Sequence, residues 1–253
     1  MNNKTKKILE NILYPILVIL IILAIWLIFA EIANSEFIMP TPADTFISLG
    51  NLLISSEFWI AFGSTLLRTL IAFVIAFLLA SSFALLSFLY KPVAKIFAPL
   101  ISILRATPTI AVILLFVIWT NANIAPMLIS ILVIFPILYT SIYSSLNSLD
   151  KDVLQMCKVY KVSTKNIVFK VCAPQVWANC HLSVSSAIAL NLKLMVAGEV
   201  LANTTQSLGG LMQGAKIYFE MADLLALTSV TIILALILEN LINLLNRPIR
   251  RWQ

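Results

Sequence analysis

The sequence predicts an all-α polytopic membrane protein with six transmembrane helices. The chain is 61% hydrophobic and only 11% charged, with a mean hydropathy of +1.01. This balance is typical of multi-span membrane proteins and excludes a soluble globular domain. Crossing the hydrocarbon core takes about 20 mostly apolar residues. The runs of that kind are 12–30, 60–88, 96–119, 124–146, 174–198 and 222–245.

Basic residues gather on one side of these spans, and this sets the orientation. Lysine and arginine near span ends stay in the cytoplasm. On one side the flanks and loops have Lys4, Lys6, Lys7, Lys91, Lys95, Lys151, Lys158, Lys161, Lys165, Lys170, Arg247, Arg250 and Arg251. The opposite side has only Lys216. Both termini are therefore predicted to be cytoplasmic. The net charge of +6 follows from this topology, so we expect no nucleic-acid partner.

The chain is predicted to form one membrane domain, residues 1–253. Its parts outside the spans are a cytosolic N-terminus, an outer loop, a cytosolic segment, a second outer loop and a cytosolic C-terminus, at 1–11, 31–59, 149–173, 199–221 and 246–253. In the first outer loop Met39-Pro40-Thr41-Pro42 interrupts any helix. Thr41 or Asp44 is then placed to cap a short interfacial helix.

Four residues in or beside the spans are candidates for a translocation pathway: Arg105, Pro108, Lys193 and Glu199. An ionisable group at bilayer depth costs at least about 2.5 kcal/mol, so it faces protein or a water-filled path. Arg105 and Lys193 would favour an anionic or strongly polar solute. The alternative is that each is paired internally and holds two helices in register. Lys193 and Glu199 are six residues apart, so they point to different faces of one helix. For Arg68 a structural pairing is favoured, and for Pro108 a structural kink.

The longest polar interruption in the second half of the chain runs from Leu149 to Pro174. It has five lysines against Asp150 and Asp152. An apolar stripe also passes through it at helical spacing, formed by Val153, Met156, Cys157 and Tyr160. The rest of the chain has no soluble domain that could bury this stripe. The segment therefore indicates docking on a cytosolic partner.

Signatures of an enzyme are absent from the sequence. It has no GxxxxGK[ST] phosphate loop, no HExxH motif and no Ser/His/Asp arrangement. The three cysteines, Cys157, Cys172 and Cys180, lack metal-ligand spacing. We therefore expect no catalytic residues, no metal site and no ATP hydrolysis by this chain itself.

The basic segment resembles the cytoplasmic coupling segment of ABC importer permeases. That segment has Glu-Ala-Ala, three residues, Gly, and a stretch ending in Leu-Pro. Here the run is Gln155-Met156-Cys157, Lys158-Val159-Tyr160, Lys161, and Ala173-Pro174 at its end. Further motifs, in order, resemble the nitrate/sulfonate/taurine-type branch: Met39–Pro42, Leu67-Arg68, Leu104–Pro108, Phe135-Pro136, Lys193–Leu201, Leu208–Leu211 and Arg250–Trp252. Each motif is weak alone, and the ordered set is strong.

Two positions depart from the family pattern. Gln155 stands where the family has Glu, so it keeps the hydrogen bonding but loses the charge that suits the start of a helix. Lys161 stands where the family has Gly, which ends the helix in a left-handed conformation. Lysine adopts that conformation at a cost of about 1 kcal/mol or more. We therefore expect a differently built turn, with Ser163 capping the next helix.

The resemblance implies a type I ABC importer permease-like core of five spans plus an extra first span. It implies an importer with two permease copies, two cytosolic ABC ATPase subunits and an extracytoplasmic solute-binding protein. The permease would lie in the lipid bilayer of a bacterial-type inner (plasma) membrane. It would have no cofactor of its own, with ATP and Mg in the partner subunit. The ATPase would contact Asp152, Val153, Gln155, Met156, Cys157, Tyr160, Lys161 and Ser163.

Alternatives from other classes are a secondary transporter or channel, in which the basic loop only sets topology, and a non-transport membrane scaffold. The six spans show no inverted repeat and no midplane acidic cluster, so an ion-coupling site is not evident. The solute implied by the resemblance is small and polar, anionic or heterocyclic. The sequence leaves its identity open, and also whether the permease pair is a homodimer or a heterodimer.

Overall fold

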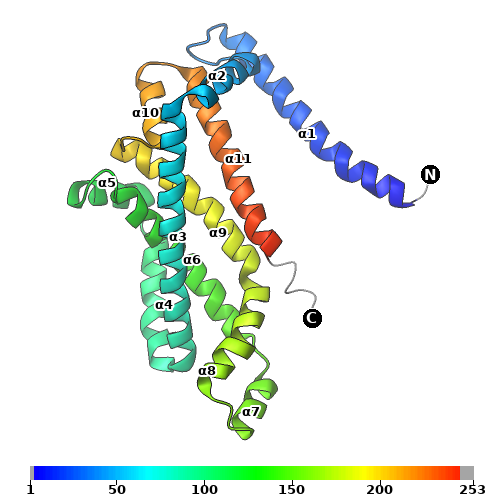
Figure 1. The fold of residues 1–253 in the computed structure, drawn as a ribbon, viewed down its shortest axis with the longest axis vertical. Helices are drawn as coiled ribbons and strands as arrows, with labels where there is room; N and C mark the ends of the chain where they lie inside the picture. The colour runs from blue at the N-terminus through cyan, green and yellow to red at the C-terminus, as the bar shows by residue number, and fades with distance from the viewer. Residues whose placement is uncertain (1–2, 246–253) are drawn as a thin grey trace. The chain divides into compact units, whose positions relative to one another are not determined.

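The computed structural model describes residues 3–245, and every regular element in that range is helical (Figure 1). This confirms the all-α prediction. The elements are α1 (Asn3–Ala33), α2 (Pro42–Ile54), α3 (Ser56–Leu89), α4 (Lys91–Ala106), α5 (Thr109–Trp119), α6 (Ala125–Asn147), α7 (Lys151–Val159), α8 (Thr164–Asn166), the π-helix η1 (Ile167–Cys172), α9 (Ala173–Ala202), α10 (Leu208–Ile217) and α11 (Met221–Leu245). The predicted C-terminus, with Arg250–Trp252, lies outside the described residues.

Contacts divide the chain into two compact units. The first is Met1–Trp59 with Leu211–Ser229, and the second is Ile60–Gly210 with Val230–Gln253. Helices α3, α10 and α11 each contribute residues to both units. The prediction of a single membrane domain therefore stays a prediction.

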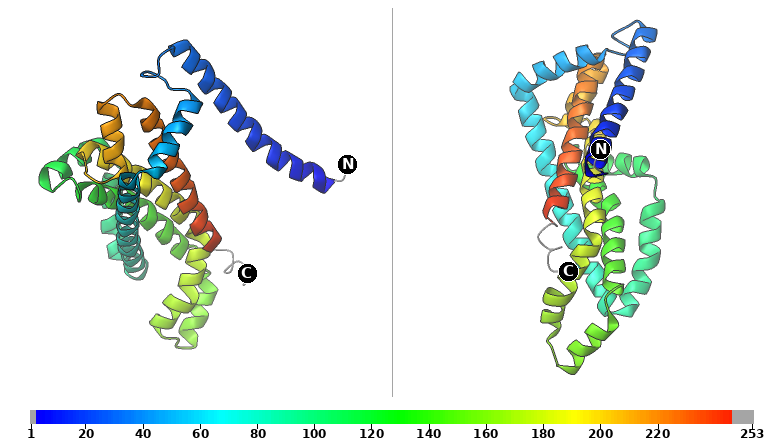
Figure 2. Two further views of the ribbon diagram at one scale, coloured as in Figure 1. Left: turned by 45° about the horizontal axis from the view of Figure 1, so that its top comes forward. Right: turned by 90° about the vertical axis from the view of Figure 1, so that its right-hand side faces the viewer.

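Five predicted spans correspond to single helical stretches that are long and apolar enough to cross a membrane. They are Ile16–Ala33, Ser56–Leu89, Ala125–Asn147, Thr164–Ala202 and Met221–Leu244. The span predicted at 96–119 is different, because α4 and α5 meet there at 94°. Figure 2 shows α5 turning away from the top of α4. The break falls at Thr107 and Pro108, since a residue before proline is driven out of the helical region. The pair is a broken span or a re-entrant loop, not one straight helix.

In the first unit, α2 begins with a capping box. The Thr41 side chain accepts a hydrogen bond from the Asp44 N–H, and the Asp44 carboxylate accepts one from the Thr41 N–H. The hydrogen bonds from Thr41 also hold the pKa of the Asp44 carboxyl below its ordinary value. Residues Thr45 and Ser48 on α2 are buried, and the Ser48 hydroxyl donates to the Asp223 carboxylate. Phe46 is 67% exposed. The apolar face of α2 therefore points away from the protein, as expected for an interfacial helix.

In the second unit, α6 and α9 form the most extensive helix pair. Gly198 lies against Pro126, so closely that a Cβ on Gly198 would be 3.0 Å from the Pro126 Cα. Close approach at small residues is the usual basis of helix packing in membranes. Aromatic rings also join α3, α4 and α6. The ring centroid of Phe97 lies 4.7 Å from that of Phe83 and 5.5 Å from that of Tyr139.

The ends of α7, α9 and α10 each have a non-glycine residue with positive φ: Lys161 at 51°, Asn203 at 53° and Phe219 at 59°. Each end has the long backbone hydrogen bond of a Schellman motif. Its donor and acceptor are Val162 and Cys157 after α7, Thr204 and Glu199 after α9, and Glu220 and Ala215 after α10. These hydrogen bonds satisfy carbonyl groups that would otherwise lack a partner, and they hold residues with a Cβ in a conformation that glycine prefers.

Candidate coupling segment and a buried polar network

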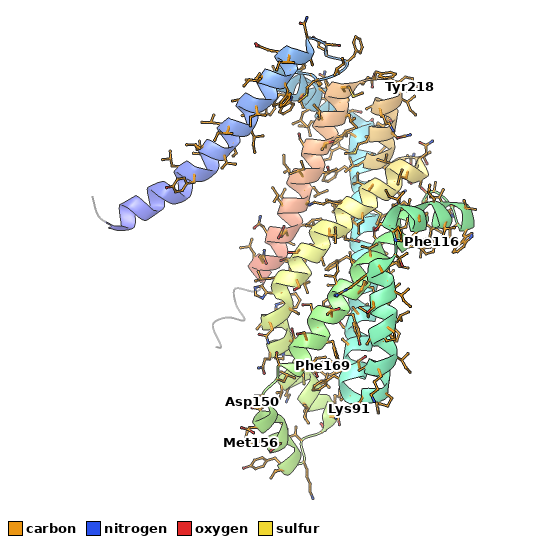
Figure 3. The ribbon with its side chains drawn as sticks, turned by 180° about the vertical axis from the view of Figure 1, so that it is seen from behind. Lys91, Phe116, Asp150, Met156, Phe169 and Tyr218 are labelled. Carbon is orange, nitrogen blue, oxygen red and sulfur yellow. The ribbon has the colours of Figure 1, made fainter. Side chains whose placement is uncertain are left out.

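Helix α7 is a short helix between α6 and α9, at the end of the second unit where Figure 3 labels Asp150 and Met156. The Asp150 carboxylate accepts a hydrogen bond from the Asp152 N–H at 2.8 Å, just where the helix begins. Asp152 lies in the first turn, where a negative charge suits the helix dipole. Lys91 and Phe169 lie at the same end of this unit (Figure 3).

Most apolar side chains of α7 and its C-terminal turn are in the open. Met156 is 57% exposed, Val159 78% and Tyr160 76%, while Val153 is 37% exposed. Large apolar side chains outside the spans, on a segment that also carries lysines, indicate a surface that a partner covers. Gln155, Lys161 and Ser163 are exposed as well.

Cys157 does not belong to this surface. It is only 9% exposed, because it follows Met156 by one position and so turns toward the protein. This burial argues against a contact with a partner, and the place of Cys157 among the ATPase-contacting residues stays a prediction. Val159 is exposed at the outer edge of the stripe.

The turn after α7 has the conformation that glycine has in the family, although the residue is lysine. Lys161 has φ of 51°, and the Val162 N–H donates to the Cys157 carbonyl at 2.9 Å. The expectation of a differently built turn was wrong, because this hydrogen bond compensates for the strain. The expected cap on the next helix is confirmed: the Ser163 hydroxyl accepts from the Asn166 N–H at 3.5 Å.

A second cluster surrounds Glu199, which is completely buried near the end of α9. Its carboxylate receives hydrogen bonds from the Thr65 hydroxyl at 2.9 Å and from the Gly209 N–H at 3.2 Å. It also forms an ion pair with Arg68 at 3.1 Å. The structural pairing predicted for Arg68 is thus confirmed. The place of Glu199 on a translocation pathway stays a prediction, and its burial favours a structural role.

This network also holds the start of α10. The Leu208 N–H donates to the Thr65 hydroxyl at 2.9 Å, and the Gly210 N–H donates to the Ser207 hydroxyl at 2.9 Å. Together with the Gly209 bond, these contacts satisfy three free N–H groups of the first turn. Sequence reasoning missed Thr65, although it shares a helix face with Arg68 three positions later.

Arg105, at the end of α4, contacts α6. Its guanidinium donates to the Thr140 hydroxyl at 2.8 Å and approaches the Pro136 carbonyl at 3.5 Å. Pro108 is the residue from which α5 starts. Both residues therefore lie at the bend between α4 and α5.

Lys193 is exposed on α9 and has no hydrogen-bond or ion-pair partner within residues 3–245. The structure thus joins Glu199 to Arg68 and Arg105 to α6, while Lys193 stands apart from both. The pathway assignment of Arg105, Pro108 and Lys193 stays a prediction.

Comparison with known proteins agrees with this architecture. The family described as "Binding-protein-dependent transport system inner membrane component" matches residues 77–251. A relative in Bacillus subtilis (strain 168), which bears the name of an aliphatic sulfonates transport permease protein, SsuC, is 20% identical over 236 residues. That match covers 92% of this chain and 85% of the relative.

Solved structures show the same fold. Two crystal forms of the MetNI methionine ABC transporter in inward facing conformations contain chains that superpose with TM-scores of 0.64 and 0.60. Sequence identity is 14% and 16%, and the matches cover 78% and 79% of this chain and 99% and 100% of those chains. With the family match over most of its length, the chain belongs to the inner membrane components of binding-protein-dependent transport systems, the permeases of ABC importers.

Proposed function

We propose that this permease couples transport to a separate cytosolic ATPase through α7. The observation that carries the proposal is the row of exposed apolar side chains at Met156, Val159 and Tyr160, on a short helix that connects two spans. An amphipathic helix of this kind fits into a groove on a partner. The exposed lysines around it add little affinity each, because ion pairs in water are weak.

In this proposal two copies of the chain pair in the membrane and bind two ATPase subunits, which hold ATP and Mg. Both chain termini and α7 are cytoplasmic, and the solute-binding protein delivers its load on the opposite side. ATP binding moves the docked α7 helices, and the paired spans switch between inward-facing and outward-facing states. The ATPase supplies the difference in stability between these states.

Substitution of Tyr160 by Asp tests the coupling role. A carboxylate in the apolar groove loses its hydration without gaining a partner. We therefore expect ATP-driven uptake to fall at least tenfold, because a loss of about 1.4 kcal/mol in docking free energy lowers the docking affinity tenfold. The measurement is uptake and ATP hydrolysis by the assembled transporter in vesicles. Tyr90→Asp is the matched control, because Tyr90 is 59% exposed and lies outside α7. Normal uptake by the Tyr160 variant would show that α7 does not dock.

The solute in this proposal is small and polar, anionic or heterocyclic. Lys193 supports it as an exposed cation without a partner within residues 3–245, and Arg105 presents a second cation at the bend of α4 and α5. The relative named for aliphatic sulfonates supports an anionic group. A charged side chain in a span is retained where it faces protein or water.

Lys193→Met tests whether this cation serves the solute. Loss of uptake at unchanged membrane insertion and unchanged co-purification of the ATPase is expected, because only the charge is removed. Lys216→Met, in the last turn of α10, is the control. Unchanged uptake of an anionic solute by the Lys193 variant would exclude a pathway role. Purification without any ATPase would instead favour a secondary transporter.

A further inference from the structure

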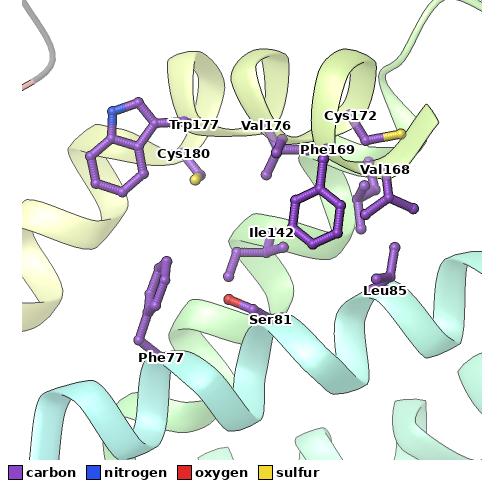
Figure 4. A pocket seen from close by; sticks show the side chains of 12 residues that line it. Phe77, Ser81, Leu85, Ile142, Val168, Phe169, Cys172, Val176, Trp177 and Cys180 are labelled. Carbon is purple, nitrogen blue, oxygen red and sulfur yellow. The ribbon is translucent and has the colours of Figure 1, made fainter. Parts of the chain in front are cut away.

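The second unit contains an elongated apolar cavity of about 360 Å³ at the end where α7 lies. Phe77, Ser81 and Leu85 of α3 form one wall, and Cys172, Val176 and Trp177 of η1 and α9 form the opposite wall (Figure 4). Phe77 and Leu85 are eight residues apart, so the cavity follows the helices for roughly 12 Å. Almost all of its lining is apolar. A long apolar slot parallel to membrane spans fits an unbranched hydrocarbon chain better than a compact polar solute.

Positive charge lies at the α7 end of this cavity. Lys165 and Lys170 are exposed on the segment that forms the wall. Lys165 precedes the lining residue Phe169 by four positions, so it shares its helix face about one turn nearer to α7. The chain has no acidic residue between Asp152 and Glu199. Nothing in this stretch of sequence neutralises the two lysines.

The cavity wall also has an unsatisfied hydrogen-bond donor. The indole Nε1 of Trp177 is buried and has no partner among the described residues. A buried tryptophan N–H normally finds an acceptor. Trp177 lies with Phe77 at the end of the cavity opposite Phe169 and Leu85 (Figure 4), so it is placed beside the acyl chain and not beside the headgroup.

We propose that this cavity binds an acyl chain of an anionic phospholipid from the cytoplasmic leaflet, with the lipid phosphate at Lys165 and Lys170. Basic pockets between membrane helices on the cytoplasmic side are suited to such headgroups. The inference rests on the proposed function in one point: α7 lies on the cytoplasmic side of the membrane. The ligand occupies the protein from the bilayer and is distinct from the transported solute.

Quenching of Trp177 by brominated lipid tests the site. The full chain, with Trp26, Trp59, Trp119 and Trp252 replaced by phenylalanine, is placed in phosphatidylcholine vesicles that contain a small fraction of brominated phosphatidylglycerol or brominated phosphatidylcholine. Each lysine near a membrane surface contributes about 1 kcal/mol toward an anionic lipid, which is about fivefold. With Lys165 and Lys170 both at the phosphate, we expect quenching by brominated phosphatidylglycerol to exceed quenching by brominated phosphatidylcholine by at least roughly fivefold. A variant that keeps only Trp119, which is 69% exposed, provides the unselective baseline.

Two sets of variants assign the binding elements. Lys165→Gln with Lys170→Gln should reduce the selectivity to the Trp119 baseline. Ser81→Phe, which fills the cavity from α3, should reduce quenching by both lipids, whereas Leu78→Phe on the exposed face of α3 should not. Ser81→Leu is the milder filling variant if the phenylalanine prevents folding.

Equal quenching by the two lipids in the parent protein would overturn the anionic site. Absence of quenching by either lipid would overturn the lipid site altogether and point to a second copy of the chain over the cavity. ATP-driven uptake measured in parallel separates the two proposals. Normal uptake with unselective quenching contradicts only the lipid site, and selective quenching without ATPase-dependent uptake contradicts only the coupling role.

Discussion

Glu199 shows how this protein accommodates a charge at membrane depth. Its carboxylate is fully buried, yet it accepts hydrogen bonds from Thr65 and Gly209 and pairs with Arg68. A buried charge is tolerated only when it is paired and its remaining lone pairs are satisfied. The ion pair thereby ties α3 to α9, and Gly209 adds α10. Removal of either charge leaves the other without compensation.

Substitution of Arg68 by Met should therefore destabilise the protein by about 3–5 kcal/mol, because the Glu199 charge stays buried without its partner. Combining Arg68→Met with Glu199→Gln should cost much less than the sum of the two single changes. Thermal unfolding of the purified variants in detergent measures this double-mutant cycle. Arg105→Met, which removes an exposed guanidinium, is the control. Additive effects of the two changes would show that the pair is not coupled.

At the scale of elements, α10 depends on a contact that only glycine permits. A Cβ on Gly209 would lie 2.7 Å from the Val196 carbonyl oxygen and would overlap the Glu199 side chain. The first turn of α10 therefore rests directly on the backbone of α9. The same approach brings the Gly209 N–H within reach of the Glu199 carboxylate.

Gly209→Ala should push α10 away from α9 and break its hydrogen bond to Glu199, at a cost of about 1–3 kcal/mol for overpacking. Gly214→Ala is the matched control on the same helix, since no heavy atom lies within 4 Å of the added Cβ. That change should stabilise α10 by about 1 kcal/mol through helix propensity. The melting temperatures of the two variants, each compared with that of the parent protein, test both expectations. An unchanged melting temperature for Gly209→Ala would contradict the close packing of α10 on α9.

At the scale of the whole molecule, the basic residues imply a single topology. The segment with Lys161 and the turn with Lys91 would both face the cytoplasm, while Glu57 and Tyr218 would face outward. Labelling of single cysteines with a membrane-impermeant maleimide in intact cells checks this. With the three native cysteines replaced by serine, Glu57→Cys and Tyr218→Cys should react at once. Lys161→Cys and Lys91→Cys should react only after permeabilisation, and the reverse pattern would refute the orientation.

Apolar length was sufficient to predict five of the spans, because a helix in a membrane is identified by composition alone. It failed for 96–119, where two helices bent by 94° together have the hydropathy of one span. Hydropathy does not distinguish a straight helix from a bent pair. The available signal was Pro108, whose effect on Thr107 interrupts the helix.

The candidate sites were predictable only in part. The exposure of Val153, Met156 and Tyr160 on and beside α7 could be expected from their spacing along one helix, whereas Cys157 of the same stripe is buried. The left-handed Lys161 was not expected, since a backbone hydrogen bond outweighs the preference of its side chain. The network at Glu199 joins Thr65 to a residue 134 positions away, and no local pattern encodes such a meeting.

The π-helix η1 between α8 and α9 has a mechanical consequence. A π turn accommodates one residue more than an α turn would over the same stretch. Deletion of a single residue from Ile167–Cys172 would return this segment to ordinary α geometry. The preceding chain, with α7, would then rotate about the axis of α9 by roughly 100°. The direction in which Tyr160 points therefore depends on the number of residues in the segment Ile167–Cys172, several turns away from it. Other members of the family can be compared for the length of this segment.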